Sequence, residues 1–127
     1  MAARPGRLMV KAPTRRLYIG SNHERDLWLI LVDDKKILYR RHIKAGANTE
    51  SLLTNIEAFL KSVKVRPQGL VLNQDNLSFS QGRVLMSLIN TLAYVWQVPV
   101  AKGTVSRVGE GNQAERLVWQ KQLAADY

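Results

Sequence analysis

The segment from Leu27 to Val32 constrains the fold of this chain more than any other part of the sequence. Side chains alternate between the two faces of an extended strand, so this segment places three leucines on one face and a tryptophan, an isoleucine and a valine on the other. A strand that is apolar on both faces is covered on both faces by other parts of the protein. The sequence therefore predicts a buried sheet with a layer packed on each side.

The flanking segments predict two partners for this strand. An apolar run from Arg16 to Asn22 precedes it, and the polar residues between the two runs indicate a hairpin. Polar residues 33–36 close the strand and lead to a third run, Ile37–Ile43, whose two arginines suit a half-exposed strand at the edge of a sheet. We expect three consecutive antiparallel strands.

The hydrophobic period changes to that of a helix after Gly46. Apolar residues recur at spacings of three and four, which predicts a helix over Thr49–Lys64 that ends before Pro67. The further predicted elements are a short strand at Gly69–Leu72, a helix at about Ser80–Gln97, a strand at Val98–Ala101 and a last helix at about Asn112–Ala124.

This order of elements predicts a fold class. Three antiparallel strands followed by helix, strand, helix and strand form a mixed five-stranded sheet with helices packed on it. That is the ribonuclease-H-like or actin-like arrangement. The 127 residues, of which 46% are hydrophobic and 23% charged, suit one globular domain, which we place at residues 16–127.

The formal net charge of +9 favours acidic partners such as nucleic acids. More than half of this excess lies in the first sixteen residues, which contain two prolines, no acid and little periodicity. We therefore expect residues 1–15 to form a disordered basic arm, which either contacts RNA or an acidic partner or serves only for solubility. The candidate nucleic-acid contacts in this region are Arg4, Arg7, Lys11, Arg15 and Arg16.

Composition excludes several classes of protein. The absence of cysteine rules out a disulfide scaffold, a cysteine zinc site and a thiol nucleophile, and it fits a reducing compartment such as the cytoplasm. The longest apolar runs fall far short of the roughly 18 to 20 residues that a membrane-spanning helix needs. We expect no membrane association and a cytoplasmic location.

Catalytic and metal-binding residues are not indicated. Nucleases of the ribonuclease-H-like class hold divalent metals with carboxylates, one of them in the middle of the first strand, where this chain has Gly20. The turn after Ile19 has a single glycine, which disfavours phosphate binding. His23 and His42 are single surface histidines in this interpretation. We expect no cofactor, no metal and no intrinsic catalysis. The candidate acids are scattered at strand ends and turns: Asp26, Asp33, Asp34 and Asp75.

The two long helices are more informative. Small side chains line one flank of the first helix, at Ser51, Asn55, Ala58 and Ser62, which allows another helix to come close. Apolar residues cover about 200° of the second helix, roughly twice the width that a one-sided helix buries. Either the two helices pack on each other beside the sheet, or together they dock another subunit.

Three segments resemble the TsaB (YeaZ) family. Residues 77–83, with the sequence LSFSQGR, resemble the family motif G-P-G-S-F-T-G-x-R, and an apolar helix and the strand residues Gln97–Val100 follow as they do in that family. Leu17–Asn22 resembles the family's opening strand I-D-T-S, and Asn48–Leu53 resembles the start of its first helix. The resemblance runs from about Arg16 to Gly103. The motif positions that match are Ser78, Phe79, Ser80, which replaces a threonine, and Arg83.

The sequence also departs from the family pattern. Gly20 replaces the aspartate of the first strand, and Asp75, Leu77 and Gln81 stand where glycines are usual. These departures argue further against phosphate binding by the motif loop, whose residues are expected to shape the loop and cap the second helix. Family members commonly have a second actin-like half, so this chain resembles the N-terminal half alone.

The resemblance implies a function. TsaB proteins are non-catalytic subunits of the bacterial machinery that puts threonylcarbamoyl on adenosine in tRNA, and they pair with the catalytic TsaD subunit through their first two helices. By this resemblance the chain would bind a TsaD-like partner, or form a homodimer through the same helices. The expected interface residues are Ser51, Leu52, Asn55, Ala58, Phe59, Ser62, Val84, Ser87, Leu88, Thr91 and Val95.

Two other functions are compatible with the sequence. The first is a basic RNA-binding or ribosome-binding module on a ribonuclease-H-like fold, with a patch made of Arg15, Arg16, Arg40, Arg41 and Lys44. The second is a divergent nuclease or sugar-kinase relative, which the missing carboxylates disfavour.

Overall fold

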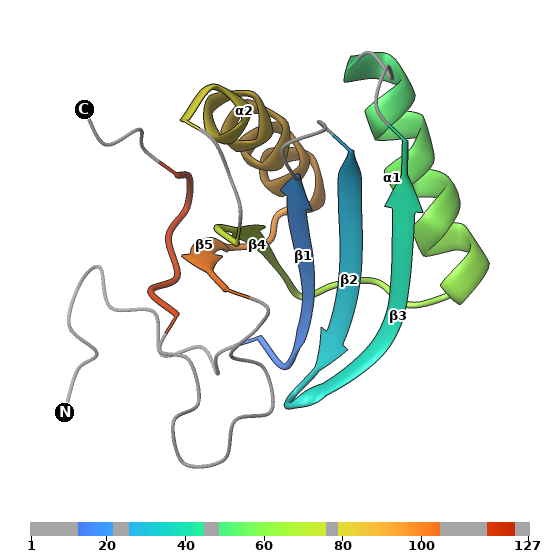
Figure 1. Cartoon of the computed structure of the whole chain (residues 1–127). Helices are drawn as coiled ribbons and strands as arrows, with labels where there is room; N and C mark the ends of the chain where they lie inside the picture. The colour runs from blue at the N-terminus through green and yellow to red at the C-terminus, as the bar shows by residue number, and fades with distance from the viewer. Residues whose placement is uncertain (1–12, 22–25, 45–48, 76–78, 105–116, 124–127) are drawn as a thin grey trace, which may run out of the picture.

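The computed structural model of the chain describes residues 13–21, 26–44, 49–75, 79–104 and 117–123. These residues form one sheet and two helices (Figure 1). In chain order the elements are β1 (Arg15–Ser21), β2 (Leu27–Asp33), β3 (Lys36–Ile43), α1 (Thr49–Val63), β4 (Gly69–Asn73), α2 (Phe79–Trp96) and β5 (Val100–Gly103).

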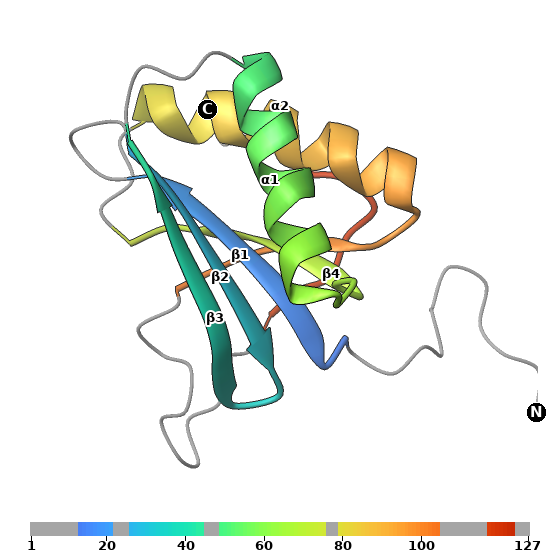
Figure 2. The same ribbon diagram turned by 90° about the vertical axis from the view of Figure 1, so that its right-hand side faces the viewer.

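The sheet has five strands in the order β3-β2-β1-β4-β5. The first three strands are antiparallel neighbours, and β4 and β5 add in parallel on the other side of β1. The two crossover connections, through α1 and α2, step across the sheet in the same direction, so right-handed crossovers place both helices on one face. Figure 2 shows both helices on that side of the sheet. The predicted mixed five-stranded sheet is confirmed.

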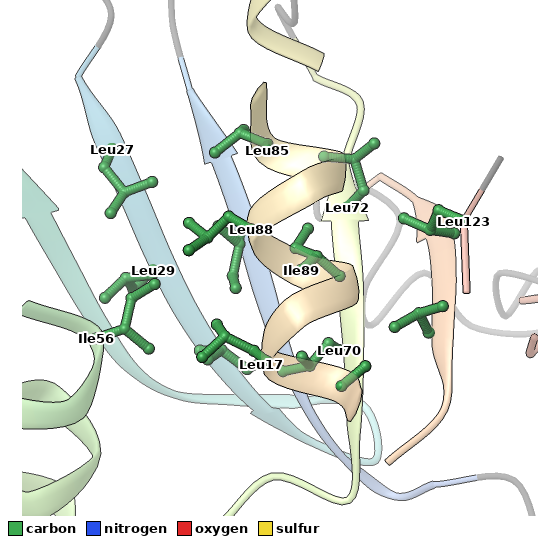
Figure 3. Close-up of a cluster of buried hydrophobic side chains, with 14 of the residues drawn as sticks. Leu17, Leu27, Leu29, Ile56, Leu70, Leu72, Leu85, Leu88, Ile89 and Leu123 are labelled. Atoms are coloured by element: carbon green, nitrogen blue, oxygen red, sulfur yellow. The ribbon is translucent and has the colours of Figure 1, made fainter. Parts of the chain in front are cut away.

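The main core lies between the sheet and the helices. Leucines of β1, β2 and β4 point from the sheet to the helices, as Leu17, Leu29 and Leu70 do in Figure 3. Helix α2 contributes Leu88 and Ile89 to the same layer. Apolar burial of this kind contributes roughly 1.5 to 3 kcal/mol for each large side chain, so this layer holds the helices in place.

A second, smaller cluster covers the opposite face of the sheet, which we call the second face. Tyr18, Ile30, Val32 and Val71 are buried there. Partly buried side chains that pack against them include Trp119 from the C-terminal segment. At Ile30 and Val32 strand β2 is thus covered on both faces, as its two-sided apolar pattern predicts. Trp28, near the start of the strand, is exposed, so the cover of the second face is partial.

The C-terminal segment does not form the predicted last helix within residues 117–123. Gln120 pairs its backbone N–H and C=O with those of Val100 at 2.8 Å each, so the segment runs along the outer edge of β5. Asn90 of α2 then holds Leu123, with Asn90 Nδ2 donating to the Leu123 carbonyl at 2.9 Å and Leu123 N–H donating to Asn90 Oδ1 at 2.7 Å. These contacts outweigh the helical periodicity. Residues 112–116 of the predicted helix lie outside the described residues.

Both helices end on a non-glycine residue in the left-handed region. Gln97 has φ 56°, and Val98 N–H donates to the Ala93 carbonyl, a bond that closes a Schellman turn after α2. Lys64 has φ 55° and donates its N–H to the Leu60 carbonyl after α1. The helix ends lie within a residue of the predicted ones.

The start of β1 is tied to the loop before β4. Thr14 Oγ1 donates to Gln68 Oε1 at 3.1 Å, and Gln68 N–H donates to the Arg15 carbonyl at 2.8 Å. The last residues of the segment expected to be a disordered arm therefore join the fold, whereas residues 1–12 lie outside the described residues. Neither described helix is long and apolar enough to cross a membrane.

Candidate functional site

The outward face of α2 carries uncharged side chains. Val84 is 54% exposed, Tyr94 80% and Val95 66%, and Ser87 and Thr91 are exposed between them. From Val84 to the end of the helix no residue is charged. A helix on a protein surface normally turns charged residues to solvent, and depletion of charge with enrichment of aromatic residues marks the core of protein interfaces.

Within residues 117–123 the C-terminal segment covers one flank of α2 and does not reach this outward face. Asn90, which holds the segment, lies roughly 100 to 140° around the helix from Val84, Thr91 and Val95. Part of the excess apolar width of α2 is thus covered within the chain, by Leu123. The exposed residues lie away from that contact.

Helix α1 presents two small side chains outward. Ala58 and Ser62 are exposed, while Ile56 and Phe59 on another side of the helix are buried against the sheet. Ser62 Oγ donates to the Phe59 carbonyl at 2.7 Å. Its hydroxyl is therefore turned back onto the helix and does not project toward a neighbouring molecule. Thr54, Glu57 and Lys61 of α1 are exposed as well. We give the name docking surface to seven exposed residues, two small ones of α1 and five uncharged ones of α2: Ala58, Ser62, Val84, Ser87, Thr91, Tyr94 and Val95.

Two residues expected at the interface belong to the core instead. Phe59 is 2% exposed and Leu88 3%, because both point from their helices onto the sheet. The guanidinium of Arg41 lies over the Phe59 ring at 5.4 Å from its centroid, on the helix side of β3. These two side chains are therefore not part of the docking surface. Asn55 is half-buried at the margin of α1, and the side chains of Ser51 and Leu52 lie outside what the structure describes.

The family-motif residues lie at the start of α2. The helix begins at Phe79, Ser80 belongs to its first turn, and Arg83 follows one turn on with an exposed side chain. Ser78 lies outside the described residues, as do the side chains of Phe79 and Ser80. Their predicted role in shaping the loop stays a prediction.

The first strand has no space for a side chain at Gly20. A Cβ built there would lie 2.9 Å from Cβ of Asn73 and 3.1 Å from its Nδ2. Asn73 is buried, and its Oδ1 accepts the N–H of Asp75 at 3.2 Å. The position where a nuclease would carry its strand carboxylate is thus filled by an asparagine from β4. Among the described residues no group of three histidine or carboxylate side chains is arranged to hold a metal ion.

The candidate nucleic-acid contacts divide into two sets. Arg4, Arg7 and Lys11 lie outside the described residues. Arg15 is exposed at the start of β1, while the guanidinium of Arg16 donates to the Asp34 carbonyl and lies 5.8 Å from the centroid of the Tyr18 ring. Arg16 therefore fastens the β2–β3 turn to β1.

Sequence reasoning missed two features near these residues. Tyr94 is absent from the expected interface residues, although its spacing from Ser87 and Thr91 places it on the same face. Trp28 and His42 stack on the second face of the sheet, with Asp26 hydrogen-bonded to His42. The pairing of β2 with β3 brings these residues together, and only the register of the strands could have shown it.

Comparison with known proteins supports the fold. No protein-family model and no curated protein matches the sequence. Among solved structures, YeaZ from Pseudomonas aeruginosa matches with a TM-score of 0.57 and 16% identity, over 72% of this chain and 44% of YeaZ. An uncharacterized protein with similarity to peptidase YEAZ from Pseudomonas aeruginosa matches with the same TM-score and identity, over 72% of this chain and 43% of that protein.

At this level of identity the likeness concerns the fold alone. The predicted resemblance to the TsaB (YeaZ) family is confirmed at that level, and the fold is ribonuclease-H-like or actin-like. The chain spans less than half the length of each of these solved structures.

Proposed function

We propose that this chain, which has the YeaZ fold, is a non-catalytic TsaB-like subunit that binds a TsaD-like catalytic partner in threonylcarbamoyladenosine modification of tRNA. The uncharged outward face of α2 is the observation that carries this proposal. A partner that covers Val84, Tyr94 and Val95 removes apolar surface from water, at about 25 cal/mol for each Å². The chemistry of the reaction belongs to the partner, and this chain supplies a rigid surface.

The shape of the docking surface supports a helical partner. Ala58 and Ser62 have small side chains, so a helix of the partner can approach the α1 backbone closely at these positions. Tyr94, whose side chain is 80% exposed, then supplies the large ring that interfaces use as an anchor. Both helices are held by the main core, so the surface is already formed before binding.

The first prediction concerns Ala58→Arg. An arginine at the centre of the outward face of α1 would hold the two surfaces apart and bury a charge, so the affinity for a TsaD-like subunit should fall by at least a hundredfold, about 2.7 kcal/mol. Titration calorimetry with the purified partner measures the affinity. Tyr94→Ala, which adds no charge, should weaken binding about tenfold or more.

The matched control is Gln120→Arg, which adds the same charge at the exposed outer edge of β5, far from α1. Its affinity for the partner should equal that of the unchanged chain. Circular dichroism and thermal unfolding establish that each variant is folded. Equal affinities for Ala58→Arg, Tyr94→Ala and the control would refute the proposal.

A further inference from the structure

An aromatic pair lies at the surface on the second face of the sheet. Trp28 of β2 and His42 of β3 are directly paired across the strands, and their rings stack with centroids 4.3 Å apart and planes 17° from parallel. Trp28 is 36% exposed and His42 is exposed. Trp119, which covers part of this face, packs on the cluster of Tyr18, Ile30, Val32 and Val71.

A buried carboxylate holds the stacked pair in place. Asp26, at the start of β2, is 8% exposed, and its Oδ2 lies 2.6 Å from Nε2 of His42. This short contact fixes the plane of the imidazole, and stacking on the imidazole restrains the indole. A flat aromatic surface is therefore formed in advance, and a ligand that stacks on it loses less side-chain entropy on binding.

Two cations flank His42 along the chain. Arg40 pairs with Ile30, whose side chain belongs to the second face, so Arg40 lies on that face two residues before His42. Lys44 is exposed two residues after His42. No acidic residue occurs between Lys35 and Lys44. Arg41, by contrast, points to the helix side and lies over Phe59.

We propose that this part of the second face binds single-stranded nucleic acid. An unpaired base stacks on the exposed part of the Trp28–His42 pair, and Arg40 and Lys44 neutralise the phosphates on either side of it. Charge complementarity selects a polyanion, and the flat ring pair selects one with unpaired bases over a duplex or a lipid headgroup. The inference does not depend on the proposed function, because α1 and α2 lie on the other face of the sheet.

The test measures binding of the full chain to a fluorescein-labelled twelve-nucleotide oligouridine by fluorescence anisotropy. The comparison probes are an oligodeoxythymidine of the same length and a twelve-base-pair RNA duplex. We expect the two single strands to bind more tightly than the duplex at equal salt. Duplex binding as tight as that of both single strands would overturn the proposal, because a purely electrostatic surface gives that result.

Variants of the aromatic pair separate stacking from charge. Trp28→Leu keeps an apolar side chain on β2 and removes the ring, and it should weaken binding of oligouridine on the order of tenfold. Trp28→Phe keeps a ring and should recover most of that loss. Unchanged affinity for Trp28→Leu, in a variant whose thermal unfolding matches that of the unchanged chain, would contradict the role of the ring. If Trp28→Leu does not fold, Trp28→Phe and His42→Leu provide the test instead. The role of the ring is contradicted if both variants bind oligouridine as tightly as the unchanged chain does.

Arg40→Gln tests the phosphate contact against a control of equal charge change. In the logarithmic plot of affinity against salt its slope should fall by about 0.7, the value for one phosphate contact with a single strand. Lys61→Gln removes one exposed cation from α1, on the other side of the molecule, and should leave the slope unchanged. Equal slopes for the two variants would show that residues outside this face carry the binding.

Discussion

Gly20 shows how one missing side chain decides what the carboxyl end of β1 can do. The space above it is taken by Asn73, and the same asparagine closes a turn with the N–H of Asp75. An aspartate at this position would need Asn73 to move. A buried carboxylate without a partner is also costly, so the site of a nuclease cannot be restored by one substitution.

Gly20→Ala should therefore destabilise the chain by about 1 to 3 kcal/mol, because the new methyl group is forced against Asn73. Urea unfolding followed by circular dichroism measures the loss. Adding Asn73→Gly to the first substitution removes the opposing Cβ, and the double variant should lose less stability than the two single losses added together. Additive losses would mean that the two side chains do not collide.

At the scale of the elements, the sequence predicts what local periodicity determines. The two-sided apolar pattern of β2 and the apolar stripes of α1 and α2 each predict their element, because burial imposes a period of 2 on a strand and of 3.6 on a helix. Local periodicity does not predict the structure of residues 117–123. The extended form of this segment depends on Val100 and Asn90, residues that lie far away in the sequence.

The docking surface shows a similar limit. Ala58 and Ser62 of the small-residue flank are exposed on α1, and Asn55 of the same flank is half-buried, so the spacing alone does not tell which residues of a helix turn to the sheet. Phe59 and Leu88, expected on the outside, lie in the core, since the axis of each helix relative to the sheet sets its buried stripe. The register of β2 and β3, which creates the Trp28–His42 pair, is likewise a property of the assembled sheet.

The attachment of the C-terminal segment to α2 can be tested through Asn90. Asn90→Ala removes both hydrogen bonds to Leu123 and leaves backbone polar groups without these partners, so stability should fall by about 1 to 3 kcal/mol. Trypsin should also cut faster after Lys121. Thr91→Ala, which removes an exposed hydroxyl on the next residue, should change stability by no more than about 0.5 kcal/mol and leave the cutting rate unchanged. Equal behaviour of the two variants would show that Leu123 is held by other contacts.

At the scale of the whole molecule, the sheet separates two surfaces of different chemistry. The helix side presents uncharged residues such as Tyr94 and Val95, whereas the second face presents a ring pair among cations. Nothing in the described contacts joins Tyr94 to Arg40, which lie on opposite sides of the sheet. The two surfaces are therefore expected to bind their ligands independently.

Substitutions on the two surfaces should therefore act independently. Tyr94→Ala should leave the affinity for oligouridine unchanged, and Arg40→Gln should leave the affinity for the protein partner unchanged. The double variant should show the sum of the single effects within about 0.5 kcal/mol in each assay, as distant sites do. Anisotropy and titration calorimetry on the same preparations provide both numbers. A coupling energy larger than this would mean that the binding sites for the protein partner and for the nucleic acid are not independent.

Among the described strands β3 is at the edge of the sheet and pairs with β2, and basic side chains on both of its faces and just beyond its ends make this edge positively charged: Lys35, Lys36, Arg40, Arg41 and Lys44. If a second copy of the chain added its β3 to this edge, the basic residues of the two copies would lie opposite each other. Their repulsion therefore opposes edge-to-edge association into fibrils. Variants in which several of these basic residues are replaced by neutral ones are expected to self-associate as their concentration rises.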